Sequence, residues 1–215
     1  MTRISASILA CNFAYLADEV RKAEDAGVHS IHIDIMDGRY VENITFGPQL
    51  ITDLKAITSL PMEVHLEMFE PDRYLDMFAK AGSDRLVVQR DCCSNPIRTM
   101  NRIRELGMEA GIAVNPADDV SLLTYLLNYI DFIIIMSVEP GFGGQNFEES
   151  SIEKIRKLKQ IMFDQGLNIP IAVDGGINVN IAERLRLEGV DILVVGSGLF
   201  KTKNLSETVQ ELLNG

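Results

Sequence analysis

The sequence predicts an α/β fold in which eight parallel strands close into a (β/α)8 barrel, and three observations carry this prediction. Short apolar runs rich in Val and Ile alternate with amphipathic segments of roughly ten to fifteen residues, a pattern typical of parallel strands covered by helices. The runs are evenly spaced along the 215 residues. No linker or low-complexity segment divides the chain, so we expect residues 1–215 to form a single domain. An open doubly wound sheet is the alternative, because periodicity alone does not establish closure.

Taken in order along the chain, the predicted strands span residues 4–9, 30–35, 62–66, 85–89, 109–114, 132–138, 169–173 and 192–195. Helical periodicity is clearest between them, at residues 16–26, 74–81, 97–106 and 152–165. Start and stop signals accompany the helices: Pro48, Pro71 and Pro96 near their starts, and Gly27, Gly82, Gly107, Gly166 and Gly189 after their ends. Eight evenly spaced strands favour a barrel over an open sheet.

The formal net charge of −11 argues against two classes of partner. Nucleic acids and anionic membranes require a basic patch, and the Lys and Arg residues are scattered along this chain. No apolar run approaches the length of a membrane span, and the first residues lack the features of a signal peptide. Cys11, Cys92 and Cys93 show no metal-type spacing, so we expect reduced thiols. The expectation is a soluble, cytoplasmic protein that binds neither nucleic acid nor membrane.

Chemistry-bearing side chains gather at the ends of three predicted strands. Because side chains alternate along a strand, one face of the second strand carries His32, Asp34 and Met36. One face of the third strand carries Glu63, His65 and Glu67, and the seventh strand ends at Asp174. In a barrel, strand carboxyl ends meet at the functional face. Two imidazoles and two carboxylates there suit a divalent metal such as zinc, iron, manganese or cobalt, and the spacing does not choose among these ions.

The plainer interpretation is that each histidine only fills the core or the rim of the barrel. The chain has three histidines, and two of them stand beside carboxylates at strand ends. His29 begins the second strand, so we expect it at the opposite end of the barrel with a structural role.

Glycine clusters follow the last three predicted strands and form a second signal. They comprise Gly141, Phe142, Gly143 and Gly144 after the sixth strand, Gly175 and Gly176 after the seventh, and Gly196, Ser197 and Gly198 after the eighth. Exposed backbone N–H groups in such loops bind phosphate in many barrels, and an acidic protein can therefore hold an anion without a basic patch. The alternative is that these glycines only permit tight turns.

These residues closely resemble the ribulose-phosphate 3-epimerase family, and the similarity runs from residue 5 to residue 200. The most specific matching segments are HIDIMDG at residues 32–38, NITFGP at 43–48, VEPGFGGQ at 138–145 and VDGGI at 173–177. The resemblance implies a TIM barrel of the ribulose-phosphate-binding type. It further implies epimerisation at carbon 3 of D-ribulose 5-phosphate to D-xylulose 5-phosphate, and a homo-oligomer.

The same resemblance implies roles for individual residues. One divalent metal would be held by His32, Asp34, His65 and Asp174, with Asp34 and Asp174 also serving as acid and base on opposite faces of the substrate. The metal would stabilise the enediolate that forms when the carbon 3 proton leaves. Substrate or phosphate contacts are implied for Ser7, His65, Gly141, Phe142, Gly143, Gly144, Gly175, Gly176, Gly196 and Ser197. Met36 and Met136 would line the site, where ordinary core filling is the alternative.

The chain departs from the family pattern at Glu67, where Met is usual. A carboxylate here could contact an extra substrate hydroxyl, add a metal ligand or repel the enediolate, or it could pair with Arg90 and stay silent. Other departures are Gln89-Arg90-Asp91 in place of His-x-Glu, Glu42 in place of Pro, and Ala6 in place of Pro.

These departures leave other functions open. One is 3-epimerisation of another ketose phosphate, such as a hexulose 6-phosphate of the allulose 6-phosphate type. Another is a non-catalytic barrel that binds sugar phosphates. A decarboxylase or aldol-type synthase is disfavoured, because such relatives place a lysine in an Asp-x-Lys-x-x-Asp motif and residues 34–37 read DIMD.

Overall fold

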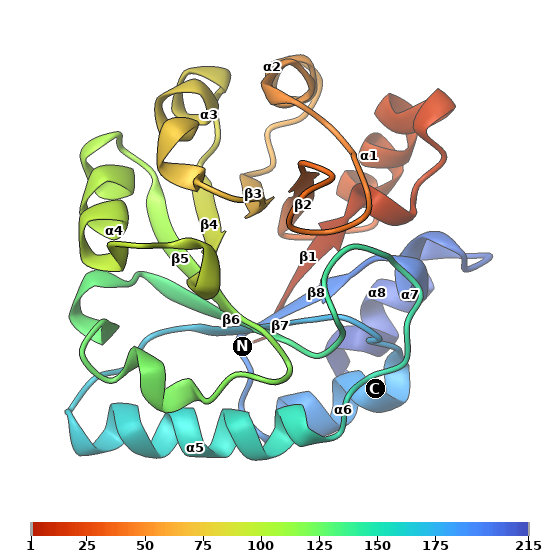
Figure 1. Ribbon diagram of the computed structural model, residues 1–215. Coiled ribbons are helices and arrows are strands. Elements are labelled where there is room, and N and C mark those ends of the chain that lie inside the picture. Colours follow the sequence, from red (N-terminus) through yellow and green to blue (C-terminus); the bar gives the residue numbers. More distant parts are fainter. Residues whose placement is uncertain (1, 215) are drawn as a thin grey trace.

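The computed structural model describes residues 2–214 and contains a closed barrel of parallel strands paired in sequence order, β1 to β8 (Figure 1). The predicted barrel is confirmed, and the open sheet is wrong. The strands are β1 (Arg3–Ser7), β2 (Ser30–Met36), β3 (Met62–Glu67), β4 (Arg85–Gln89), β5 (Glu109–Val114), β6 (Phe132–Met136), β7 (Ile171–Asp174) and β8 (Ile192–Val195).

Several predicted strand boundaries are one residue off, and three need correction by two residues. β1 ends at Ser7, and residues 8–10 form a 3-10 turn that the apolar sequence did not distinguish from a strand. β6 ends at Met136 rather than at residue 138, and β7 begins at Ile171 rather than at residue 169. Val138 and Ile169 lie just outside the sheet. Their side chains are nevertheless buried, so their apolar character resembles that of strand residues.

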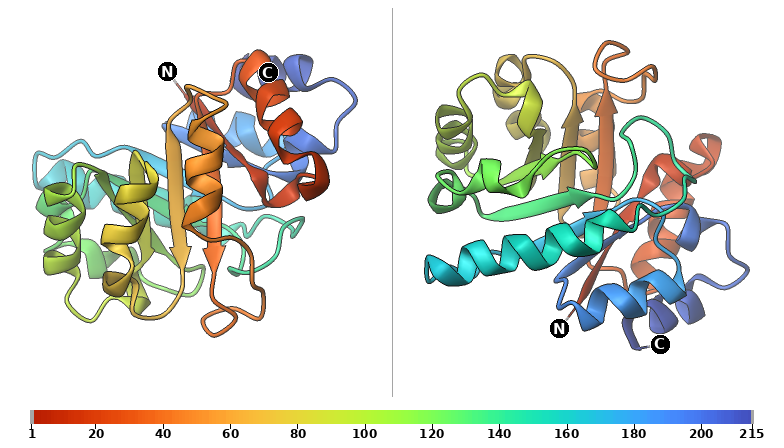
Figure 2. Two further views of the ribbon diagram at one scale, coloured as in Figure 1. Left: turned by 90° about the horizontal axis from the view of Figure 1, so that it is seen from above. Right: turned by 60° about the horizontal axis from the view of Figure 1, so that its bottom comes forward.

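Helices surround the barrel (Figures 1 and 2). They are α1 (Leu16–Asp25), α2 (Pro48–Lys55), α3 (Leu75–Ala81), α4 (Pro96–Glu105), α5 (Ser150–Asp164), α6 (Val179–Leu187), α7 (Ser197–Phe200) and α8 (Leu205–Asn214). α1 is typical, because it buries Leu16, Val20 and Ala23 at helical spacing against the sheet. The connection after β5 contains only two 3-10 turns, Val120–Leu123 and Leu127–Tyr129. No helix in the described part of the chain is long and apolar enough to span a membrane.

The barrel interior has a polar half and an apolar half. Buried polar side chains come from β1, β2, β3 and the end of β4: Ser5, Ser7, Ser30, His32, Asp34, Glu63, His65, Glu67 and Gln89. Apolar side chains fill the space between β4 and β8: Val87, Ala113, Phe132, Ile134, Met136, Ala172 and Ile192. The fit in the apolar half is close, because a Cβ on Gly111 would lie 2.5 Å from Phe132 Cζ. The polar residues therefore face a closely packed apolar wall.

A repeated aspartate contact closes the amino-terminal end of the barrel. Asp84, Asp131 and Asp191 each stand directly before an even-numbered strand. Each accepts a hydrogen bond from a backbone N–H near the start of the preceding strand, at 2.7 Å for Asp84, 2.8 Å for Asp131 and 2.9 Å for Asp191. These bonds satisfy N–H groups that begin the strands and fix neighbouring strands relative to one another. This end of the molecule serves stability.

Candidate functional site

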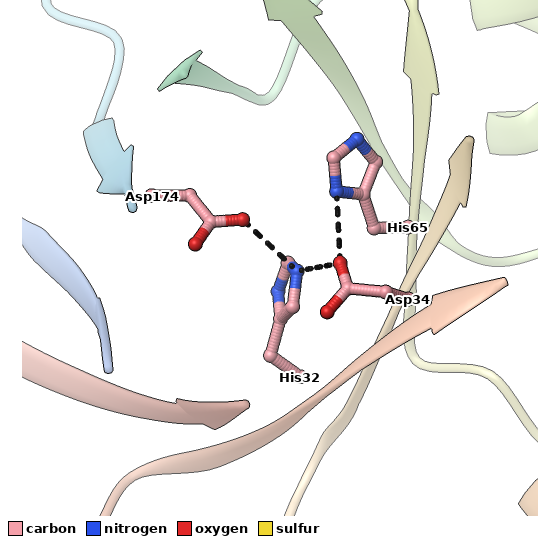
Figure 3. Close-up of side chains that lie close together, drawn as sticks. All are labelled: His32, Asp34, His65 and Asp174. Atoms are coloured by element: carbon pink, nitrogen blue, oxygen red, sulfur yellow. Dashed lines mark hydrogen bonds and ion pairs between the residues drawn. The ribbon is translucent and has the colours of Figure 1, made fainter. Parts of the chain in front are cut away.

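Four titratable side chains meet inside the carboxyl-terminal half of the barrel. His32, Asp34, His65 and Asp174 each offer one ligand atom, and these atoms all lie within 4.8 Å of one another. Figure 3 shows the side chains pointing toward a common centre, with Asp174 approaching from the side opposite to His65. The arrangement follows from strand alternation and register, because His32 and Asp34 share a face of β2 and Asp34 pairs with His65 on β3.

Distances within this cluster are short. His32 Nε2 lies 2.9 Å from Asp34 Oδ1 and 3.5 Å from Asp174 Oδ2. His65 Nδ1 lies 3.3 Å from the same Asp34 oxygen. The four atoms are of the kinds that divalent transition metals prefer in proteins, and they surround one small space.

Glu63 holds His32 from below, a contact that sequence reasoning did not assign. Its Oε1 lies 2.8 Å from His32 Nδ1 and accepts a hydrogen bond from Ser5 Oγ at 3.1 Å, while its Oε2 lies 3.5 Å from Arg85 Nη1. Because Nδ1 is engaged by Glu63, Nε2 is the nitrogen directed at the cluster. The alternation along β3 placed Glu63 on the same face as His65, and that was the available signal.

Gln89 stands behind His65 in a similar way. Its side-chain Nε2 lies 3.1 Å from His65 Nε2, while Gln89 Oε1 and His65 Nδ1 are both buried without a hydrogen-bond partner. Exchanging the amide oxygen and nitrogen of Gln89 would let His65 Nε2–H donate to Oε1. The lone pair of His65 Nδ1 would then face the cluster. Both imidazoles are thus supported by a side chain from a neighbouring strand.

The two aspartates have pKa values displaced in opposite directions. Burial acts to raise the pKa of Asp34, but the charge of His32, its hydrogen bond to Asp34 and the nearby His65 outweigh burial, and the pKa is lowered. Burial raises the pKa of Asp174 to about 7, opposed by the charge of His32 and reinforced by that of Asp34. Pairs of carboxyl groups separated in this way are suited to opposite roles in proton transfer.

A pocket opens above the cluster, and the predicted substrate-contacting residues line it. They include Ser7, Asp34, Met36, Glu67, Met136, Gly141, Phe142, Gly143, Gly144, Asp174, Gly175, Gly176, Gly196 and Ser197. His32 and His65 lie beneath the pocket floor and are fully buried. Ser7 Oγ donates a hydrogen bond to Asp34 Oδ2 at 3.1 Å, which leaves Asp34 Oδ1 to face the imidazoles. The structure therefore brings all the predicted site residues to one end of the barrel.

The glycine loops require glycine at particular positions. Gly175 and Gly176 have φ of +117° and +62°, and a Cβ on Gly176 would lie 2.4 Å from the backbone nitrogen of Phe147. The loop after β7 therefore packs directly against the chain that follows β6, and its backbone is exposed to the pocket. Asn43 Nδ2 donates to Gly141 O at 2.9 Å, which ties the loop after β2 to the loop after β6.

Two further expectations concern Glu67 and His29. Glu67 does not pair with Arg90, because no ion pair joins them among residues 2–214 and Arg90 Nε is buried without a partner. The silent ion-pair interpretation of Glu67 is therefore wrong. His29 lies at the opposite end of the barrel, where its Nδ1 accepts the N–H of Ile4 at 3.1 Å.

Comparisons with known proteins agree with this geometry. A model of the ribulose-phosphate 3 epimerase family matches residues 3–200. The chain is 38% identical over 213 residues to ribulose-phosphate 3-epimerase of Bacillus subtilis, covering 99% of this chain and 98% of that protein. It is 41% identical over 209 residues to the chloroplastic ribulose-5-phosphate-3-epimerase of Arabidopsis thaliana, covering 96% of this chain and 74% of that protein.

The barrel also resembles more distant solved structures. A mutant tryptophan synthase α-subunit from the hyperthermophile Pyrococcus furiosus superimposes with a TM-score of 0.74 at 17% sequence identity, covering 100% of this chain and 98% of that one. At this identity the likeness shows the fold alone.

Proposed function

The chain belongs to the ribulose-phosphate 3-epimerase family, and we propose that it interconverts D-ribulose 5-phosphate and D-xylulose 5-phosphate with one divalent metal ion bound. As a member of this family it is an isomerase that acts on a carbohydrate phosphate. The observation that carries the finer proposal is the meeting of two imidazoles and two carboxylates at the floor of a pocket lined by glycine loops.

The donor set fits a divalent metal. His32, Asp34, His65 and Asp174 would hold it, and the buried, unpartnered Nδ1 of His65 would be satisfied by coordination. A bound ion would act as a Lewis acid, lowering the free energy of negative charge on the substrate when its carbon 3 proton leaves. Glu63 and Gln89 would orient the two imidazoles for this purpose. The donors do not distinguish zinc, iron, manganese and cobalt.

Proton transfer is assigned to Asp34 and Asp174. They project from β2 and β7, on different sides of the pocket, so each would reach a different face of carbon 3. One aspartate takes the proton from one face, and the other delivers a proton to the opposite face, which inverts the centre. Exchange of the two roles gives the reverse reaction.

The glycine loops after β6, β7 and β8 are assigned to the phosphate. Gly175, Gly176 and Gly196 expose backbone to the same pocket, and N–H groups bind an anion without a cationic side chain. Met36 on β2 and Met136 on β6 line the same pocket, where their apolar side chains would exclude water from the reacting carbon.

The test is the exchange of solvent deuterium into carbon 3 of ribulose 5-phosphate, followed by proton NMR with and without a chelator. We expect metal-dependent exchange together with the appearance of xylulose 5-phosphate. Exchange only into a hexulose 6-phosphate would show that the proposed substrate is wrong. Absence of exchange into either sugar, with metal supplied, would favour a barrel that only binds sugar phosphates.

Asp174→Asn separates catalysis from folding. We expect this variant to lose roughly 10²- to 10⁴-fold in turnover with little change in circular dichroism. Asp53→Asn is the matched control, because Asp53 is exposed on α2 and outside the pocket. Full activity in Asp174→Asn would contradict the two-aspartate mechanism.

We also propose that the chain forms one domain and assembles as a homo-oligomer. One domain spanning residues 1–215 should unfold in a single cooperative transition. A homo-oligomer should sediment as a multiple of the 23.9 kDa chain.

A further inference from the structure

Glu67 is a buried carboxyl group without an assigned function in the reaction described above. It is 2% exposed, and its Oε2 has no hydrogen-bond partner. Its carboxyl group accepts a hydrogen bond from the backbone N–H of Gly141, and its Oε1 lies 4.0 Å from His65 Nδ1, so Oε2 is the oxygen that remains open. A buried carboxyl oxygen left unpartnered is costly to the folded state, so its retention in a pocket wall points to a partner that arrives with the ligand.

The position of Glu67 in the barrel specifies which part of a ligand it faces. Glu67 pairs in register with Met36, two residues beyond the pairing of Asp34 with His65. It therefore stands one inward-facing position nearer the pocket mouth than the cluster. In a closed barrel of eight strands in sequence order, β3 lies opposite β7. Figure 1 shows β3 across the barrel from β7 and β8, whose glycine loops line the far side of the pocket.

The orientation of the substrate follows from these positions. With the phosphate in the loops after β7 and β8 and carbon 3 between Asp34 and Asp174, the unphosphorylated end of the sugar extends toward β3. In a 2-ketose that end is carbon 1, which carries a hydroxyl group. A hydroxyl donor opposite an unpartnered carboxyl oxygen completes a hydrogen bond that is otherwise missing.

We propose that Glu67 determines specificity at the unphosphorylated end of the substrate, by accepting a hydrogen bond from the carbon 1 hydroxyl of a 2-ketose phosphate. The inference rests on the proposed function, because it uses the placement of phosphate and carbon 3. It adds a requirement on the substrate that the metal cluster and the glycine loops do not impose. A site built to bond a hydroxyl rejects the analogue that lacks it, since the protein group is then left unpaired.

The competing explanation is that Glu67 only supports the loop after β6 and does not contact the substrate. The carboxyl group of Glu67 accepts a hydrogen bond from the backbone N–H of Gly141, and this contact by itself would support the loop after β6. A supporting role would affect every substrate equally. A bond to carbon 1 affects only substrates that carry the hydroxyl, and this difference makes the two roles separable.

The experiment compares ribulose 5-phosphate with 1-deoxyribulose 5-phosphate, using solvent deuterium exchange at carbon 3 to obtain kcat/KM for each. The proteins are the wild type, Glu67→Met, Glu67→Gln and the control Met136→Leu. We expect the wild type to prefer the hydroxylated substrate by about tenfold or more, the value of one hydrogen bond to a buried carboxyl group. Glu67→Met should abolish the preference, and Glu67→Gln, which keeps an acceptor oxygen, should retain most of it. Met136→Leu, on the opposite wall, should leave the preference at its wild-type value whatever it does to both rates.

Equal losses on both substrates in Glu67→Met would assign Glu67 to loop support and overturn the inference. A wild type without a preference would also overturn it. A wild type that catalyses no exchange into ribulose 5-phosphate would overturn the proposed function, and this inference with it.

Discussion

Replacing Glu63 with Gln is expected to weaken metal binding without unfolding the barrel. Glu63 and His32 are both fully buried and are joined by a 2.8 Å hydrogen bond, so the charge of Glu63 acts on His32 with little screening by solvent. Gln has nearly the same shape and keeps one acceptor oxygen for His32 Nδ1. The ring orientation should therefore persist while the negative charge is lost.

The magnitude follows from what is removed. Losing the partner behind a metal-bound imidazole typically lowers metal affinity about 10- to 100-fold. Because an acceptor oxygen remains in place, we expect the lower end, about tenfold, which corresponds to about 1.4 kcal/mol of binding free energy. Arg85 keeps its 2.8 Å ion pair with Glu109, so its guanidinium is not left unpaired.

The assay is a competition titration against a chromophoric chelator at fixed pH, which reports the metal Kd independently of turnover. Glu109→Gln is the matched control, because it removes the other carboxylate bound to Arg85 and does not contact His32. We expect that control to bind metal as the wild type does. An unchanged Kd in Glu63→Gln, or equal weakening in both variants, would refute the assignment of Glu63 as the residue that orients His32.

Three further predictions concern stability. Gly111→Ala should destabilise the protein by about 1–3 kcal/mol in urea, because the added methyl would overlap Phe132. Gly143→Ala, whose added carbon meets no atom within 4 Å, should change stability little, and equal effects would contradict the packing argument. Burial acts to raise the pKa of Asp131, but hydrogen bonds from Arg104 and a backbone N–H outweigh it and lower the pKa, so Asp131 stabilises the fold above its unfolded pKa of about 3.9 and ceases to do so as pH falls through the folded pKa. Urea midpoints at pH 6 and pH 3 should therefore differ less in Asp131→Asn than in the wild type, and the same difference in both proteins would disprove this linkage. Returning metal to chelator-treated protein at about 100 times its Kd should raise unfolding free energy by about 2.7 kcal/mol, and no rise in melting temperature would be inconsistent with a site formed only in the folded state.

The sequence alone predicted the strand order and the side chains that share a strand face. Alternation along residues 32–36 and 63–67 is a local property, so it placed His32 with Asp34 and Glu63 with His65 before any tertiary contact was known. Glycine clusters after successive strands also indicated the functional end of the barrel. This signal is local too, because the positive φ at Gly175 and Gly176 is a requirement of the loop itself. The two 3-10 turns after β5 were not predicted from the sequence, because such short turns produce no helical periodicity.

Tertiary structure alone decided which of these groups meet. Asp174 comes within 3.5 Å of His32 only because β7 and β2 face the same interior once the barrel closes. Glu63 proved to hold His32, and Gln89 to hold His65, through contacts between neighbouring strands that depend on register and rotamer. Glu67 ends β3 and Arg90 directly follows β4, the neighbouring strand, yet the acidic and the basic side chain do not pair. Which residues share one face of a strand is determined locally. Which side chains then contact one another is determined by the packing of the whole barrel.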